Sequence, residues 1–358
     1  MKNDGPVLVI NAGSSSLKLG LYERRSGDVG ALWEATVEGA VSADALAQGT
    51  RQMREQVKNV EPTLVAHRVV HGGPTLLVHR LVDDEVKDTL RACAGFAPLH
   101  VPVALALVAA AEQAYPGLPQ VACFDTAFHR TLPEVARRLP IPRKWHDEGV
   151  RRYGFHGLSY ESIVHHFGAA LPHRTIVAHL GSGASVAAIL DGRSVDTSMG
   201  MTPTGGIVMG TRSGDLDPGV LVYLMRQGLD RDAIERLVDH ESGLAGLADG
   251  EHDVRRLEAS PAGTLALDVF VASVKKTIAA YAAVLGGVDL VVFTGGIGEH
   301  SARVRREVCA GLTWMGVALD EDCNTKNAAL LSTGAVQVRV VRSEEDAQMA
   351  RRAFEVVD

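Results

Sequence analysis

The sequence predicts an α/β protein made of two related halves. Its 358 residues exceed what one compact core usually holds, which favours two domains. An apolar strand, a Gly/Ser turn and a second strand open the chain around Gly13-Ser14 in NAGSSSLKL. The pattern recurs half a chain later around Gly181-Ser182 in HLGSGASVA. Most α/β proteins contain several such units, so the pattern alone leaves two interpretations open: a duplication with a cleft between the halves, or chance similarity.

In the first half, apolar periodicity predicts alternating strands and helices. In the strand at 17–22, Leu17, Leu19 and Leu21 share one face and Lys18 lies on the other. The other expected elements are a strand at 7–10, an amphipathic helix at 44–59, a strand at 64–70, an Ala-rich helix at 101–115 and a strand starting at 120 that runs into a polar turn by 128.

In the second half, three strands begin near residue 174 and helices follow. The charged, turn-rich segment from Arg143 to Tyr153 is the expected crossover between the halves. Expected helices are those at 217–227, 230–239, 262–284 and 301–311, and strands are expected at VDLVVF and QVRVV, before a closing helix.

Composition excludes several classes of protein. Apolar residues make up 46% and charged residues 22%, as in an ordinary globular protein, and the net charge of −7 argues against a nucleic-acid-binding face. The four cysteines show no CxxC or zinc spacing, and the most apolar stretch, 101–111, is too short to span a bilayer. The apolar run after MKNDGP is too short for a signal peptide, so we expect a cytoplasmic protein with no membrane partner.

Three Gly-rich turns follow apolar strands and are candidates for binding an anion. They are NAGSSSLK at 11–18, HLGSGAS at 179–185 and TGGIGE at 294–299. Successive backbone N–H groups in such turns form a nest for phosphate, and glycine allows close approach of the ligand. For NAGSSSLK alone, a solvated hairpin turn is slightly favoured over a phosphate site. Three such turns in one chain shift the balance toward phosphate.

Charged residues near strand ends supply the candidate chemistry. Arg68 in HRVVHGG and Arg212 in MGTRSGDLDPG carry the forked guanidinium that fits carboxylate and phosphate, although a surface salt bridge is the usual role of a single arginine. Asp125 ends a strand, where α/β folds bind ligands, or it caps a turn. His156, between two glycines, is either functional or a packed loop residue.

Oxygen-bearing side chains are the candidate ligands if a magnesium ion is bound. Those considered are Asn11, Asp125 and the pair Glu344-Glu345. A GxSxG nucleophile elbow is absent from the sequence, which leaves serine hydrolase chemistry by that route unsupported.

These motifs, in this order and over nearly the whole chain, resemble the acetate kinases, which belong to the actin-like ATPase (ribonuclease H-like) superfamily. The motifs are NAGSSSLK, HRVVHGG, FDTAFH, YGFHG, HLGSGAS, MGTRSGDLDPG and TGGIGE. The resemblance implies two duplicated actin-like α/β domains, at 1–148 and 149–344, with a cleft that closes during turnover. It also implies that the closing helix, 345–358, packs on the first domain, and that the protein is a homodimer.

The resemblance also implies site residues, each carried over by position. Asp125, His156 and Arg212 resemble the catalytic residues, and Arg68 resembles the arginine that holds the substrate carboxylate. Val70, Leu99, Phe155 and Pro203 match the pocket for the acyl methyl group, and Asn11 and Glu344 match the residues associated with Mg²⁺ or Mn²⁺. The nucleotide (ATP/ADP) contacts implied are Ser14, Ser16, Lys18, His179, Leu180, Gly181, Ser182, Gly183, Asp253, Val254, Arg255, Gly296, Ile297, Gly298, Glu299 and His300.

The implied reaction is reversible phosphoryl transfer from ATP to acetate, giving acetyl phosphate and ADP. Its nucleophile is already ionised, so the site must bring two anions together rather than remove a proton. Asp125 is therefore expected to be a magnesium or water-network ligand, not a proton acceptor.

Four features depart from the family pattern. Ser182 stands where the family usually has Asn, Gly205 where Glu is common and His300 where Asn is usual, and the segment 24–63 is compressed. Two alternatives within the class are a propionate or other short-chain carboxylate kinase and a pyrophosphate-dependent acetate kinase. The alternative from another class is a non-catalytic actin-like ATP-binding module, which the presence of Arg68, His156 and Arg212 disfavours.

Overall fold

In the computed structural model, which describes residues 5–13, 16–97 and 100–358, the chain divides into two compact units. Unit 1 comprises Met1–Arg130, Gly157–Ser162 and Glu344–Asp358, and unit 2 comprises Thr131–His156 and Ile163–Ser343. The chain therefore passes from one unit to the other four times.

The units differ from the expected boundary at 148/149, and hydrogen bonds explain the difference. Residues 131–148 belong to unit 2, where Thr131 donates to the Ser194 carbonyl and Arg152 donates to the carbonyls of Ala136 and Thr197. The residues from Gly157 to Ser162 belong instead to unit 1.

Unit 1 contains a mixed sheet with strand order β3-β2-β1-β4-β6-β5. Strands β1, β2 and β3 are antiparallel neighbours, whereas β1, β4 and β6 are parallel, with β5 as an antiparallel edge. The bounds are β1 Val7–Ala12, β2 Ser16–Arg25, β3 Asp28–Glu38, β4 Leu64–Val69, β5 Arg80–Leu81 and β6 Gln120–Phe124.

The sheet of unit 2 repeats this topology, with strand order β11-β10-β7-β8-β9. Strands β7, β8 and β9 are antiparallel neighbours, and β7, β10 and β11 are parallel. The bounds are β7 Arg174–Leu180, β8 Ala184–Leu190, β9 Arg193–Thr197, β10 Leu290–Thr294 and β11 Gln337–Val340. Five strands correspond in order and direction, which confirms the expected duplicated α/β fold.

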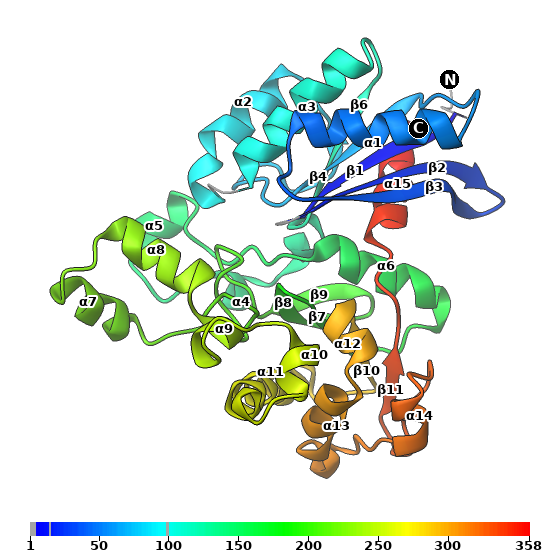
Figure 1. Ribbon diagram of the computed structural model, residues 1–358. Coiled ribbons are helices and arrows are strands. Elements are labelled where there is room, and N and C mark those ends of the chain that lie inside the picture. The colour runs from blue at the N-terminus through cyan, green and yellow to red at the C-terminus, as the bar shows by residue number, and fades with distance from the viewer. Residues whose placement is uncertain (1–4, 14–15, 98–99) are drawn as a thin grey trace. The chain divides into compact units, whose positions relative to one another are not determined.

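Helices cover both faces of the unit 1 sheet (Figure 1). Leu46 and Met53 of α1 and Leu107 of α3 pack on one face, with the leucines of β2. Met349 and Phe354 of α15 pack on the other face. The helices are α1 Ala43–Gln56, α2 Asp84–Ala92, α3 Val101–Ala114 and α15 Glu345–Val357, while α6 Gly157–Phe167 begins in unit 1 and ends in unit 2.

In unit 2 the long helix α11 packs against β7 and β8. Its C-terminal end is well defined, because Gly286 adopts the left-handed conformation (φ 68°) that terminates helices. The helices of this unit are α4 Glu134–Arg137, α5 Arg143–Asp147, α7 Pro218–Arg226, α8 Arg231–His240, α9 Gly243–Leu247, α10 Val254–Glu258, α11 Thr264–Leu285, α12 Gly295–His300, α13 Ala302–Ala310 and α14 Glu321–Thr325. Within the described ranges, neither unit holds a helix long and apolar enough to cross a bilayer.

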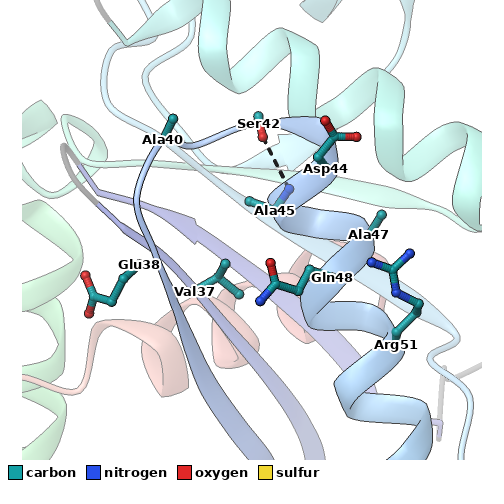
Figure 2. Close-up of a pocket in the computed structure, with 9 residues that line it drawn as sticks. All are labelled: Val37, Glu38, Ala40, Ser42, Asp44, Ala45, Ala47, Gln48 and Arg51. Carbon is teal, nitrogen blue, oxygen red and sulfur yellow. Dashed lines mark hydrogen bonds between the residues drawn. The ribbon is translucent and has the colours of Figure 1, made fainter.

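A surface pocket of about 380 Å³ lies in unit 1 between the end of β3 and the start of α1 (Figure 2). Ser42 caps α1 beside it by accepting a hydrogen bond from the Ala45 N–H. Its charged lining residues, Glu38, Asp44 and Arg51, are exposed, so the pocket is an open depression in the surface.

Candidate active site

Strand alternation places three candidate residues of unit 1 on one face of the sheet. Val7 and Val9 of β1 face α15, and Asn11 continues this series at the end of the strand. On β4, Arg68 shares the face of Leu64 and Ala66. Directly after β6, Asp125 continues the alternation of Val121 and Cys123 on that same face. Since β1, β4 and β6 are parallel, their carboxyl ends meet at one edge, where α/β sheets bind ligands.

Arg68 and Asp125 form the central ion pair of this edge. Arg68 Nε lies 3.0 and 3.1 Å from the two oxygens of Asp125, and Nη2 lies 2.7 Å from Oδ2. Burial raises the pKa of Asp125, while the Arg68 guanidinium acts against that rise. All three bonds end on carboxylate oxygens, so the geometry is that of an ionised aspartate, and Nη1 is the part of Arg68 directed elsewhere.

Asn11 and the first turn of α15 complete the edge. Arg68 Nη1 donates to Asn11 Oδ1 (3.2 Å) and lies 3.8 Å from Glu345 Oε2, and Asn11 Nδ2 donates to Asp346 Oδ1 (2.5 Å). Lys18 is the cross-strand partner of Asn11, so its side chain leaves the same face. Burial raises the pKa of Asp346, and the charge of Lys18 acts against that rise.

The charges of this cluster are suited to a hard cation. The three carboxylates Asp125, Glu345 and Asp346 lie near the cationic side chains of Arg68 and Lys18. Among the described residues, no three His, Cys, Asp or Glu side chains form a metal cage by themselves. In proteins, Mg²⁺ commonly binds through one or two side-chain oxygens and completes its coordination with water and substrate phosphates, and Asn11 and Glu345 carry oxygens of that kind.

Glu344, the expected metal residue, lies at the edge of this cluster. Its side chain is half exposed and 3.6 Å from Arg351, and its backbone N–H donates to Ser162. Glu345, the other member of the acidic pair, is the one near Arg68. The contact between Asp346 and Asn11 was missed in the sequence, although an acidic run at a helix start was a visible signal.

A buried network lies behind Asp125 in unit 1. His79 Nδ1 accepts from the N–H of Phe124, the residue before Asp125, and His79 Nε2 is 3.5 Å from Glu161. Glu161 also accepts from Arg352 (2.8 Å) and Gln348. Burial opposes ionisation of Glu161, but His79 and Arg352 outweigh it and lower the pKa to about 2. The network thus ties α6 and α15 to the strand that carries Asp125.

In unit 2, His156 occupies a strained and well-supported position. It has left-handed dihedral angles (φ 58°, ψ 24°), which are uncommon for a residue other than glycine and often mark functional sites. Its Nδ1 is 2.8 Å from Ser185 Oγ, and its ring stacks on His179 with 4.4 Å between centroids. The ring is therefore held in one orientation, with Nε2 directed toward Gly183.

Gly183 is where His156 and Arg212 approach each other. A Cβ on Gly183 would lie 3.4 Å from both His156 Nε2 and Arg212 Nη1. Arg212 Nη1 also donates to the Pro203 carbonyl at 3.3 Å. The Arg212 guanidinium and the His156 ring nitrogen, which can donate to phosphate oxygens when it carries a proton, thus flank a position that has no side chain.

The loop that carries Arg212 is anchored on both sides. The Gly210 N–H donates to the Ser182 carbonyl, which joins the loop to the Gly-rich turn. Thr211 and Ser213 donate to the carbonyls of Asp239 and Val238 at the end of α8. Arg212 is therefore rigidly placed although it lies outside helices and strands.

The expected nucleotide segments of unit 2 include both surface and interior residues. Gly296 and His300 of α12 are exposed, whereas Leu180 and Val254 are buried and can offer only backbone atoms to a ligand. Asp253 caps α10 and pairs with the exposed Arg255.

Two side chains hold α12 in place. Glu299 accepts from the N–H groups of Gly295 and Ser343. The fully buried Arg305 donates to the Gly298 carbonyl and to oxygens of Asn324 and Asn327. Arg305 was not recognised in the sequence as a contributor to this region, because a helical arginine usually indicates a surface position.

The remaining expected residues are spread over both units. Ser16 begins β2, and Val70 follows β4, both in unit 1. Phe155 is buried in unit 2, and Pro203 and Gly205 lie partly buried in the loop before Arg212. Ser14, Ser15 and Leu99 lie outside the described residues.

Comparison with known proteins accounts for this arrangement. The model of the acetokinase family matches residues 44–351. The chain belongs to the acetokinase family. An acetate kinase of Methylocella silvestris is 40% identical, with 98% of each chain covered. The crystal structure of Porphyromonas gingivalis acetate kinase superposes with a TM-score of 0.87 (35% identity, 99% and 100% covered). The crystal structure of a propionate kinase from Francisella tularensis superposes with a TM-score of 0.89, at 31% sequence identity. The match covers 98% of this chain and 100% of that one.

As a member of the acetokinase family, the protein is a phosphotransferase with a carboxyl group as acceptor. The structure brings Asn11, Arg68 and Asp125 together in unit 1, and His156, Arg212 and the 179–183 turn together in unit 2.

Proposed function

We propose that the protein catalyses reversible, Mg²⁺-dependent phosphoryl transfer from ATP to acetate. The observation that carries the proposal is the convergence of His156 Nε2 and Arg212 Nη1 at Gly183, which forms a fixed pair of donors for a transferring phosphoryl group. Relatives in the acetokinase family that are named acetate kinase, at about 40% identity, support acetate as the acceptor and ATP as the donor.

Unit 1 would bind the acceptor. Arg68 uses Nε and Nη2 for Asp125, so Nη1 is the group it offers to the substrate carboxylate. Asp125 is buried and already accepts three hydrogen bonds, so its role is to hold Arg68 and the charge of the site, not to remove a proton. An Asp125→Asn variant with full turnover and unchanged magnesium dependence would contradict this role.

Magnesium would neutralise phosphate charge and orient the nucleotide when bound. Asn11 and the acidic pair Glu344-Glu345 supply the oxygen atoms that would hold it, directly or through water. In unit 2, His156 and Arg212 donate to the phosphoryl oxygens as charge shifts during transfer.

Propionate is the second candidate acceptor, because a propionate kinase is structurally as similar as an acetate kinase. One methylene in an apolar pocket discriminates by about 1–3 kcal/mol, so preference is a matter of degree. Pyrophosphate is an alternative donor because Ser182 and His300 depart from the nucleotide-binding pattern.

A hydroxamate assay for acyl phosphate tests the proposal, with acetate, propionate and butyrate against ATP and pyrophosphate. We expect the highest kcat/KM for acetate with ATP. Arg68→Ala should mainly raise the KM for the carboxylate, and Arg212→Ala should lower kcat about 10²- to 10³-fold. If no pair of substrates yields acyl phosphate, the proposed function is wrong; loss of ATP affinity alone in both variants would overturn the residue roles.

We also propose that the protein is a homodimer, as the resemblance implies. Helix α7 in unit 2 exposes Val220, Val222, Tyr223 and Met225, an apolar surface that a second copy would cover. Light scattering should give twice the chain mass, and Val222→Glu should shift the mass toward the monomer. A monomeric wild type would refute this point.

A further inference from the structure

The Asn11 side chain is held between an acidic residue, Asp346, and a basic residue, Arg68. Its Nδ2 donates to Asp346 Oδ1 (2.5 Å), and its Oδ1 accepts from Arg68 Nη1 (3.2 Å). A carboxylate only accepts and a guanidinium only donates, so these partners allow one orientation of the amide. The carbonyl oxygen faces Arg68 and the ligand edge of the sheet, and the NH₂ group faces α15.

Asp346 can hold this orientation because the rest of α15 is fixed in the core. Met349, Ala350 and Phe354 pack on the sheet face from which Asn11 projects. This places the first turn of α15, with Asp346, over the end of β1. Asp346 interacts with Lys18 and Glu345 as well as with Asn11, so it belongs to the charged cluster of unit 1.

We propose that Asp346 is the positioning residue of Asn11 and thereby sets the affinity of unit 1 for the divalent cation that accompanies the nucleotide. The proposal rests on the proposed function. A carbonyl oxygen is a ligand for a hard cation, whereas an amide NH₂ is not. Without Asp346, only the longer bond from Arg68 (3.2 Å) holds the amide of Asn11, so the amide can more easily turn its NH₂ group toward the cation or its bound water.

Two substitutions separate orientation from charge. Asp346→Asn removes the charge but keeps an oxygen that can accept from Asn11 Nδ2. Asp346→Leu removes both the negative charge and the oxygen that accepts from Asn11 Nδ2. Loss of a partner that orients a metal ligand typically weakens metal binding about 10- to 100-fold. We therefore expect that range for Asp346→Leu and a smaller loss, below about tenfold, for Asp346→Asn.

The experiment measures Mn²⁺ binding to the full chain by electron paramagnetic resonance, in the presence of ADP and without turnover. Glu355→Gln is the matched control: it removes one negative charge from an exposed position of the same helix, where the partner is Arg352. Its Mn²⁺ affinity should equal that of the wild type. Thermal unfolding monitored by circular dichroism verifies that each variant is folded.

An Asn11→Ala background completes the test. If Asp346 acts through Asn11, Asp346→Leu should cause little further loss of Mn²⁺ affinity in this background. Equal losses in both backgrounds, or wild-type affinity in a folded Asp346→Leu variant, would overturn the proposal alone. Failure of the wild type to bind Mn²⁺ with ADP would overturn the proposed function and this proposal together.

Discussion

Replacing Gly183 with alanine should separate catalysis from folding. The new methyl group would lie 3.4 Å from both His156 Nε2 and Arg212 Nη1, which is ordinary van der Waals contact. Gly183 does not have the positive φ that disfavours alanine. The substitution should therefore leave the free energy of unfolding unchanged or raise it by about 0.4–1 kcal/mol, because alanine restricts the unfolded chain.

The same methyl group occupies the space between the two donors. A phosphoryl group that binds both would be displaced by about 1 Å, and a displacement of that size costs about 10²-fold in rate. This corresponds to about 2.7 kcal/mol in the activation free energy. We expect kcat in the hydroxamate assay to fall by about this factor.

Gly200→Ala is the control for this substitution. Its Cβ would meet no atom within 4 Å, and the residue also lies in a loop of unit 2. This variant should retain wild-type kcat. A Gly183→Ala enzyme with a wild-type melting temperature and kcat within about threefold of the wild type would show that the phosphoryl group does not pass between His156 and Arg212.

Three further predictions concern neighbouring residues. Ser185→Ala should lower kcat about tenfold with little change in the KM for ATP, because His156 loses the bond that orients its ring. For Glu161, whose pKa falls from 4.5 to about 2 on folding, stability is present above pH 4.5 and is lost as the pH falls toward 2. Urea titrations should show that Glu161→Gln removes this dependence, worth at most about 3 kcal/mol. Arg305→Met should cost about 3 kcal/mol in calorimetry, since buried acceptors at Gly298 and Asn324 lose their donor; an unchanged melting temperature would contradict it.

Most of the fold could be predicted because its strands are short and strongly patterned. The leucines of β2 alternate, and Leu17, Leu19 and Leu21 are indeed buried together. The division of the chain into units is harder to predict from the sequence. It depends on long-range hydrogen bonds such as that of Thr131 with the Ser194 carbonyl, which leave no periodic signal in the sequence.

The candidate site was predictable where residues lie in dense Gly-rich motifs, as with Arg212 and the 179–183 turn. The pairing of Arg68 with Asp125 was not, because 57 residues separate them and only the parallel register of β4 and β6 brings them together. Ser185 and Asp346 escaped notice for a related reason. Ser185 contacts His156 and Asp346 contacts Asn11, and in both cases the partner lies far away in the sequence. No local sequence pattern identifies such a partner.

The position of α15 has a consequence for biosynthesis. The sheet of unit 1 is assembled from the first 130 residues, yet one of its faces is covered by Met349, Ala350, Ala353 and Phe354. At about 5–20 residues per second, a ribosome completes the whole of unit 2 before it reaches this helix. Until then Val7, Val9 and Val121 have no cover from α15. The nascent chain therefore presents an apolar surface that a chaperone can bind, and the unit made first is the last to be finished.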